Sequence, residues 1–202
     1  MRLFLFLFFM CGYLIAPAQS QKVTLLEGDL SLLKGQTTIG VTFTYDSMLV
    51  ETNTPEEQFV KTKKADLDQK QAGLGARWEK AWTEDRKWKL EPAFKNMFAR
   101  TLKISTIGKS QYAFIFHTRR TVPGWNFGVA LVQQESIIDG EAFLIDTSDP
   151  TKILAKLELT GMDGRGTIAQ HAWETGDQIA KAYETAGREL AYFVKSNMKK
   201  KK

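Results

Sequence analysis

Carboxylates in the region 139–149 are the first residues in this chain whose types and spacing could perform catalysis. Asp139 and Glu141 lie on a predicted β-hairpin that Asp146 closes. Two carboxyl groups about 5 to 9 Å apart can serve as acid and nucleophile in glycoside hydrolysis. Turns explain Asp139, Asp146 and Asp149 better, and an exposed strand position explains Glu141. We assign no catalytic residue, and a carboxylate-based glycan hydrolase using Asp139 and Glu141 stays as an alternative.

Few histidine and cysteine residues are available for catalysis or metal binding. The sequence contains His117, His171 and the single cysteine Cys11. A zinc site needs three or four ligands, mostly imidazole or thiolate, and a nucleophilic triad needs a base and an orienting acid beside the nucleophile. We predict His117 at the surface end of a strand and His171 in the first turn of a helix. We predict no metal site and no cofactor.

A glycine-rich segment, 161–166, precedes a predicted helix and has the general look of a phosphate-binding loop. It lacks the Lys-Ser/Thr pair of a P-loop, and its glycine spacing does not match the dinucleotide-binding pattern. Its aspartates also fall short of an EF-hand ligand set. We predict a flexible connector, with an anion or peptide contact at the start of the helix as the alternative.

Tryptophan and arginine side chains are the candidates for binding. Trp78 and Trp82 stand four residues apart, which predicts a buried stripe on one helix face, with exposed recognition as the alternative. Trp125 lies in a predicted turn shortly after Arg119 and Arg120, and it is the tryptophan most expected to face a ligand. The candidate partner-binding residues are therefore Trp125, Arg119, Arg120, Trp78 and Trp82.

Periodicity predicts the strands that must position these residues. Alternation of apolar and small polar residues over 38–45 indicates a strand with one face on the core. The Asp139-Gly140 pair between two apolar runs is typical of a hairpin turn. The remaining expected strands are 23–27, 112–118, 127–132, 136–138, 141–146 and 153–159.

Helix signals divide the chain further. Thr54 followed by Pro55 and two glutamates predicts a helix start, with Pro55 at the first helical position, and an exposed helix through 61–70. Further helical segments are expected around 78–88, from 92 to 102 and from about 168 to 198. This order predicts an α+β two-layer sandwich, in which helices, including a long C-terminal one, pack on a mostly antiparallel or mixed sheet.

The N-terminal segment 1–18 has the pattern of a secretory signal peptide. Arg2 precedes the apolar run 3–10, and Ala16-Pro17-Ala18 predicts cleavage before Gln19. The run is too short to span a bilayer, which takes about 20 apolar residues. Bulky residues before Cys11 argue against lipid attachment there. The predicted organisation is a signal peptide over 1–18, one α+β domain over 19–198 and a lysine tail over 199–202.

The basic balance of the chain comes from its tail. The 28 Lys and Arg exceed the 23 Asp and Glu by five, and Lys199–Lys202 supply four of these positive charges. Nucleic-acid binding needs basic residues concentrated on a folded face, so we predict no nucleic-acid partner. The tail is interpreted as a solvated terminus, with attachment to anionic lipid or peptidoglycan as the alternative.

The order of elements resembles the TolB amino-terminal domain and lipoprotein activators of penicillin-binding proteins. The strands at 39–45, 140–146 and 153–159, the helix at 92–102 and the closing helix carry the resemblance. It implies a non-enzymatic envelope protein with a mixed sheet against helices. The charged insertion 61–89 has no counterpart there, a lipid anchor is missing, and no functional residue is carried over.

In general character the chain also resembles exported proteins of gut Bacteroidetes. We therefore predict a non-enzymatic protein, periplasmic or extracellular, that binds another envelope protein. A glycan-binding module centred on Trp125 is the alternative binding role.

Overall fold

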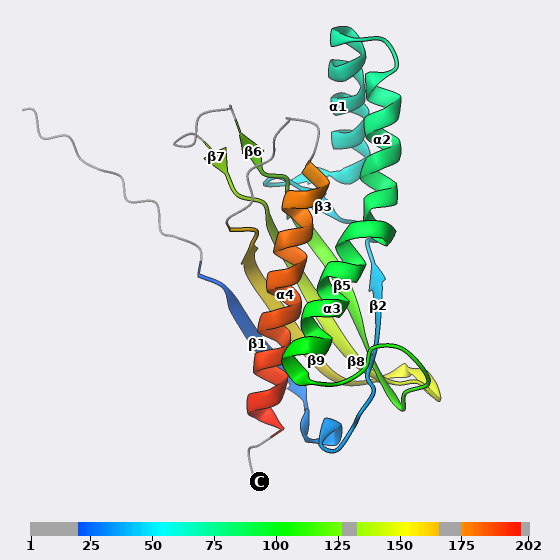
Figure 1. Ribbon diagram of the computed structural model, residues 1–202, viewed down its shortest axis with the longest axis vertical. Helices are drawn as coiled ribbons and strands as arrows, with labels where there is room; N and C mark the ends of the chain where they lie inside the picture. The colour runs from blue at the N-terminus through cyan, green and yellow to red at the C-terminus, as the bar shows by residue number, and fades with distance from the viewer. Residues whose placement is uncertain (1–19, 127–132, 166–174, 199–202) are drawn as a thin grey trace, which may run out of the picture.

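The computed structural model describes residues 20–126, 133–165 and 175–198, and it confirms the predicted α+β fold. Helices α3 and α4 cover one face of a seven-stranded sheet (Figure 1). The strands of this sheet are β1 (Lys22–Gly28), β2 (Gly40–Thr44), β3 (Leu49–Val50), β4 (Thr54–Pro55), β5 (Tyr112–Val122), β8 (Ile137–Asp146) and β9 (Asp149–Asp163). The short strands β6 (Trp125–Asn126) and β7 (Gln133–Gln134) pair separately. The helices are η1 (Ser31–Leu33), α1 (Glu56–Lys70), α2 (Leu74–Asp85), the π-helical turn η2 (Arg86–Leu90), α3 (Glu91–Leu102) and α4 (Thr175–Asn197).

The sheet is mixed, as the sequence predicts. Its order is β1-β9-β8-β5-β3-β4, and β2 also pairs with β5. The pairs β1–β9, β9–β8 and β8–β5 are antiparallel, whereas β2 and β3 both run parallel to β5. The long strand β5 is therefore the centre of the sheet, with β8 along one side and two shorter strands along the other.

Aromatic side chains fill the core between the sheet and its two covering helices. Phe94 of α3 meets Phe116 of β5 with ring centroids 4.8 Å apart, and Phe98 packs edge-on against Phe114 at 5.8 Å. All four rings are fully buried. Helix α4 reaches this layer closely at Gly187, where a Cβ would lie 2.4 Å from the carbonyl oxygen of Phe94.

Helices α1 and α2 form a hairpin that extends beyond the end of the sheet (Figure 1). Trp78 and Trp82 of α2 pack on each other at 5.4 Å and on Phe59 of α1 at 6.0 and 5.6 Å. Their exposed fractions are only 5% and 9%. The structure thus confirms the predicted buried stripe, which holds the two helices of the hairpin together.

The predicted turn at Asp139-Gly140 is wrong. Strand β8 continues through both residues, and the hairpin turn to β9 lies after Asp146, which pairs with Asp149. Gly140 instead allows close packing, because a Cβ there would lie 2.7 Å from both the ring of Phe116 and the carbonyl oxygen of His117. The aspartate-glycine pair thus serves a tertiary contact rather than a turn.

Three other local predictions also need correction. Pro55 pairs with β3 and is the N-cap of α1, not its first helical residue. His117 lies in the middle of β5, because that strand continues to Val122. Gly161 belongs to β9 rather than to a connector. Four predictions fall outside the described residues, which resume at α4: the signal peptide over 1–18, the strand over 127–132, the position of His171 and the helix start near 168.

Candidate functional site

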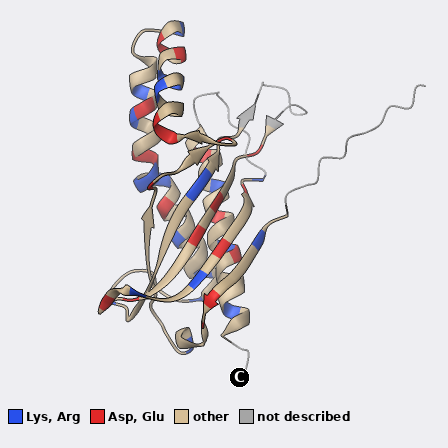
Figure 2. Ribbon diagram, turned by 180° about the vertical axis from the view of Figure 1, so that it is seen from behind, with Lys and Arg blue, Asp and Glu red and all other residues tan. Residues whose placement is uncertain are grey.

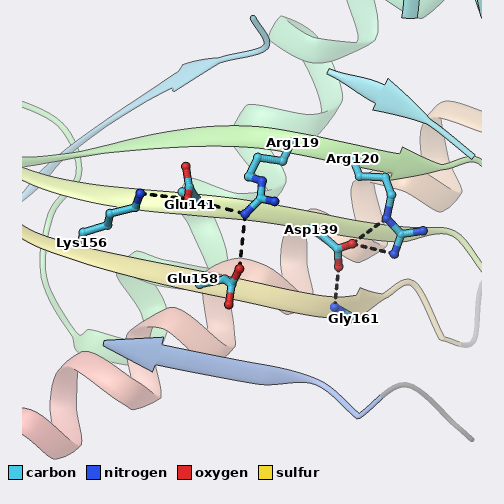
Figure 3. A network of polar contacts seen from close by, with 7 residues as sticks. All are labelled: Arg119, Arg120, Asp139, Glu141, Lys156, Glu158 and Gly161. Carbon is cyan, nitrogen blue, oxygen red and sulfur yellow. Dashed lines mark hydrogen bonds and ion pairs between the residues drawn. The ribbon is translucent and has the colours of Figure 1, made fainter. Parts of the chain in front are cut away.

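Seen from the side away from α3 and α4, the long strands of the sheet contain several charged residues (Figure 2). No described helix lies over this face. Six charged residues from β5, β8 and β9 form one cluster there with a backbone amide (Figure 3). We call this cluster the open-face network, and it comprises Arg119, Arg120, Asp139, Glu141, Lys156, Glu158 and the amide of Gly161.

A β-bulge in β5 brings two consecutive arginines into this network. Thr118 pairs with Gly140 and Arg120 pairs with Asp139, so Arg119 is the extra residue of the bulge. In a regular strand, neighbouring side chains point to opposite faces. Here both arginines reach carboxylates on the open face, while Thr118 is buried on the covered face.

Asp139 holds one half of the network rigidly. Its Oδ2 accepts a 2.6 Å hydrogen bond from Nε of Arg120 and forms an ion pair with Nη2 of the same guanidinium group, also at 2.6 Å. Its Oδ1 accepts a 2.7 Å hydrogen bond from the amide of Gly161. That amide is available because the pairing of β8 with β9 shifts register between Ile138 and Gly140. Asp139 therefore joins three neighbouring strands at their bulged positions.

Arg119 belongs to the looser half. Its Nη1 lies 3.3 Å from Oε1 of Glu158 and 3.6 Å from Oε1 of Glu141. Glu141 is held more closely by Lys156, whose Nζ lies 3.1 Å away and 5.4 Å from the ring centre of Phe143. The Arg119 side chain is 51% exposed, against 24% for Arg120. Arg119 is thus the arginine with a guanidinium group accessible to another molecule.

The two carboxylates of the alternative function, a glycan hydrolase, also lie in this network. Asp139 and Glu141 are two residues apart on β8, which places their α-carbons roughly 7 Å apart on one face. Both carboxylates accept contacts from arginine or lysine, and they lie on the open sheet face. A glycosidase acid instead needs surroundings that keep it protonated beside the scissile bond.

A second group of polar side chains surrounds a small cavity between the base of the helical hairpin, the sheet and α4. The cavity volume is about 20 Å³, which suits a single water molecule. Tyr45 and Tyr183 line it, and the guanidinium carbon of Arg86 lies 4.3 Å from the ring centre of Tyr45. Burial raises the pKa of both tyrosines well above the ordinary value of a phenol.

Ion pairs beside this cavity attach the hairpin to the body of the protein. Arg86 pairs with Glu56, and Lys89 bridges Asp85 at 3.4 Å and Asp177 of α4 at 3.0 Å. Partial burial raises the pKa of Asp85, although Lys89 acts in the opposite direction. These contacts explain the charged residues here as connections between η2 and the helices around it.

The structure brings together only part of the predicted binding set. Arg119 and Arg120 meet in the open-face network, whereas Trp78 and Trp82 lie inside the hairpin. Trp125 is the first residue of β6. The structure describes its backbone and not its side chain, so its binding role stays a prediction.

Sequence reasoning missed Lys156 and Glu158 as members of the network. Their signal was charge at alternate positions of a predicted strand, which is also the pattern of any solvated strand face.

No group of three or more His, Cys, Asp or Glu residues within 20–126, 133–165 and 175–198 is arranged to hold a metal ion. Across the same ranges, no helix combines the length and apolar character needed to cross a membrane.

Comparison with known proteins yields structural matches alone. No family model matches the chain, and no curated protein matches it. Among solved structures, a dodecamer of a PelC variant from Paraburkholderia phytofirmans matches with 13% identity and a TM-score of 0.30, over 82% of this chain and 97% of that one. A second PelC dodecamer from the same organism matches with 12% identity and a TM-score of 0.33, over 82% and 98%. At these values no residue or role is transferred, and the resemblance to TolB-type domains stays a prediction.

Proposed function

We propose that this chain is an exported, non-enzymatic binding module that recognises an envelope protein through the open face of its sheet. The N-terminal pattern over 1–18 supports export. The open-face network supports the location of the binding surface, with Arg119 as its principal contact residue.

The observation that carries this proposal is the difference between the two neighbouring arginines. Arg120 forms a 2.6 Å ion pair with Asp139. Arg119 is half exposed and lies 3.3 Å from the carboxylate of Glu158 and 3.6 Å from that of Glu141. A bulge that turns an extra arginine to the accessible face is a feature that proteins use to aim side chains. Arginine is also enriched among the residues that contribute most to protein interfaces.

Apolar surface next to the network supports a protein partner. Ile115 of β5 pairs with Phe143 of β8, which lies beside Lys156 on the same face. Both apolar side chains are only partly buried. Protein interfaces combine an apolar or aromatic centre with a polar rim, and this part of the sheet offers both.

The test compares two exposed arginines. The mature chain from Gln19 is immobilised and exposed to envelope extract, and retained proteins are identified by mass spectrometry. The purified partner is then titrated against wild type, Arg119→Ala and the control Arg100→Ala, which removes an exposed arginine from α3. We expect Arg119→Ala to weaken binding by at least about tenfold, which is within the range of interface contact residues. Equal binding by both variants would contradict the assignment of Arg119.

The same experiment separates the other functions considered. If the chain retains peptidoglycan or polysaccharide instead of protein, the glycan-binding role is favoured and Trp125→Ala becomes the informative variant. If purified glycan is hydrolysed, and Asp139→Asn or Glu141→Gln abolishes hydrolysis, the chain is an enzyme. Either result would overturn the proposed function.

A further inference from the structure

A groove with apolar walls and lysines around it lies at the end of the molecule opposite the helical hairpin, near the end of α4 (Figure 1). Its volume is about 530 Å³. Leu102, Ile104 and Met198 contribute apolar surface. We call it the lysine groove, after its three charged lining residues, Lys34, Lys103 and Lys195.

The charges of the lysine groove are all of one sign. Of its ten lining residues three are lysines and none is acidic. Among the described residues, none of the three lysines forms an ion pair, whereas Lys64 and Lys80 of the hairpin and Lys156 of the open face do. The groove therefore presents positive charge to whatever molecule approaches it.

Helix termini explain these lysines only in part. Lys103 is the C-cap of α3 and Lys195 lies in the last turn of α4, where positive charge interacts favourably with the helix dipole. Lys34 follows the short helix η1 and has no such role at a longer helix. Dipole compensation also does not account for the apolar walls between the three lysines.

Further lysines follow the groove residue Met198 in the sequence. Met198 lines the groove, and Lys199–Lys202 follow it directly. Two exposed apolar residues accompany these lysines: Leu32, 43% exposed, lies two residues before Lys34, and Ile107, 86% exposed, lies four residues after Lys103. Lysines mixed with exposed aliphatic side chains are typical of surfaces that rest on a membrane interface.

We propose that the lysine groove docks the protein on an anionic lipid bilayer. The ammonium groups of Lys34, Lys103 and Lys195 contact lipid phosphates, while Leu32 and Ile107 enter the boundary between headgroups and acyl chains. Because lysine acts as a point charge without a fixed binding geometry, this surface suits many mobile phosphates better than one shaped protein partner. Docking here would direct the helical hairpin away from the bilayer (Figure 1). The proposal does not depend on the protein-binding role of the open face.

Vesicle sedimentation tests this proposal. The mature chain is mixed with vesicles of equal parts phosphatidylcholine and phosphatidylglycerol, and with vesicles of phosphatidylcholine alone. We expect binding to the anionic vesicles only. The triple variant Lys34→Glu, Lys103→Glu, Lys195→Glu should lower the partition coefficient by at least about tenfold, since each lysine near an anionic surface contributes about fivefold.

A matched control separates the groove from net charge. The triple variant Lys61→Glu, Lys70→Glu, Lys80→Glu makes the same charge change at exposed positions of the helical hairpin, and it should lower binding by less than about threefold. Equal loss in both triple variants, or equal binding to neutral vesicles, would overturn the proposal.

Two milder variants keep the test informative if the first triple variant fails to fold. Lys34→Gln with Lys195→Gln removes two charges of the groove without reversing them, and Leu32→Ser with Ile107→Ser keeps every charge. Each should weaken binding several-fold while leaving the thermal unfolding midpoint unchanged. No loss in either variant, with both folded, would contradict the proposed contact.

Discussion

The hydroxyl groups of Thr118 and Tyr183 lie 2.5 Å apart and connect the centre of the sheet to α4. Both residues are buried, with exposed fractions of 0% and 1%. Thr118 is also the last regular residue before the bulge that contains Arg119. The bulge is therefore held from the covered face by this hydrogen bond, and from the open face by the pairing of Arg120 with Asp139.

Replacing the phenol at this position should weaken the fold. In Tyr183→Phe, the buried hydroxyl of Thr118 loses its partner, which should lower the free energy of unfolding by about 1–2 kcal/mol. Urea denaturation measures the change. The control Tyr192→Phe alters an exposed side chain of the same helix and should change stability by less than about 0.5 kcal/mol. Equal values for the two variants would show that the hydrogen bond contributes nothing.

Alkaline pH should destabilise the protein through its buried tyrosines. Burial raises the pKa of Tyr45 and Tyr183 above 10.0, the value expected in the unfolded chain. Their contribution is therefore fully present below about pH 10 and is lost as the pH rises further, because the unfolded chain releases the protons first. The free energy of unfolding should fall by about 1.4 kcal/mol per pH unit for each tyrosine.

Urea titrations at a series of alkaline pH values measure this slope. Tyr183→Phe removes one of the two groups and should make the fall with pH less steep, whereas Tyr192→Phe should leave it unchanged. A slope identical in wild type and Tyr183→Phe would contradict the role of burial.

The rigid half of the open-face network predicts a stability effect of a carboxylate. Asp139→Asn removes the charge that Arg120 faces and disturbs the acceptor of the Gly161 amide. Because hydrogen bonds to charged groups contribute more than neutral ones, we expect a loss of about 1–3 kcal/mol in the free energy of unfolding. The control Glu158→Gln weakens only the longer contact with Arg119 and should cost less than about 1 kcal/mol. Chemical denaturation in low salt compares the two, and a larger effect of Glu158→Gln would contradict this order.

Regular elements of this fold were predictable because their signals are local. Alternation over 38–45 and 112–118 and the helical pattern of α4 depend on neighbours in sequence. The Asp139-Gly140 error has a non-local cause. The same two residues that favour a turn are used for an ion pair with Arg120 and for close packing on Phe116.

The candidate site was predictable only in its individual residues. Arg119 and Arg120 stood out as a charged pair, but a bulge inserts one residue into a pairing pattern and leaves no mark in composition. The network depends on this register, which also brings Glu158 of β9 beside Arg119 of β5. Sequence could not separate the tryptophan stripe from a surface platform, because the partner ring, Phe59, comes from another helix.

Gly187 of α4 should be sensitive to the addition of one methyl group. At an exposed helical position Gly→Ala stabilises by about 1 kcal/mol through helix propensity. Here the added Cβ would lie 2.4 Å from the carbonyl oxygen of Phe94, so α3 and α4 must separate. We expect a net loss of about 1–3 kcal/mol in Gly187→Ala, as in other overpacked cores. Thermal unfolding measures it beside Ser196→Ala, an exposed position of the same helix that should stay within about 0.5 kcal/mol of wild type. A stabilised Gly187→Ala would mean that the contact between the two helices is looser than the structure shows.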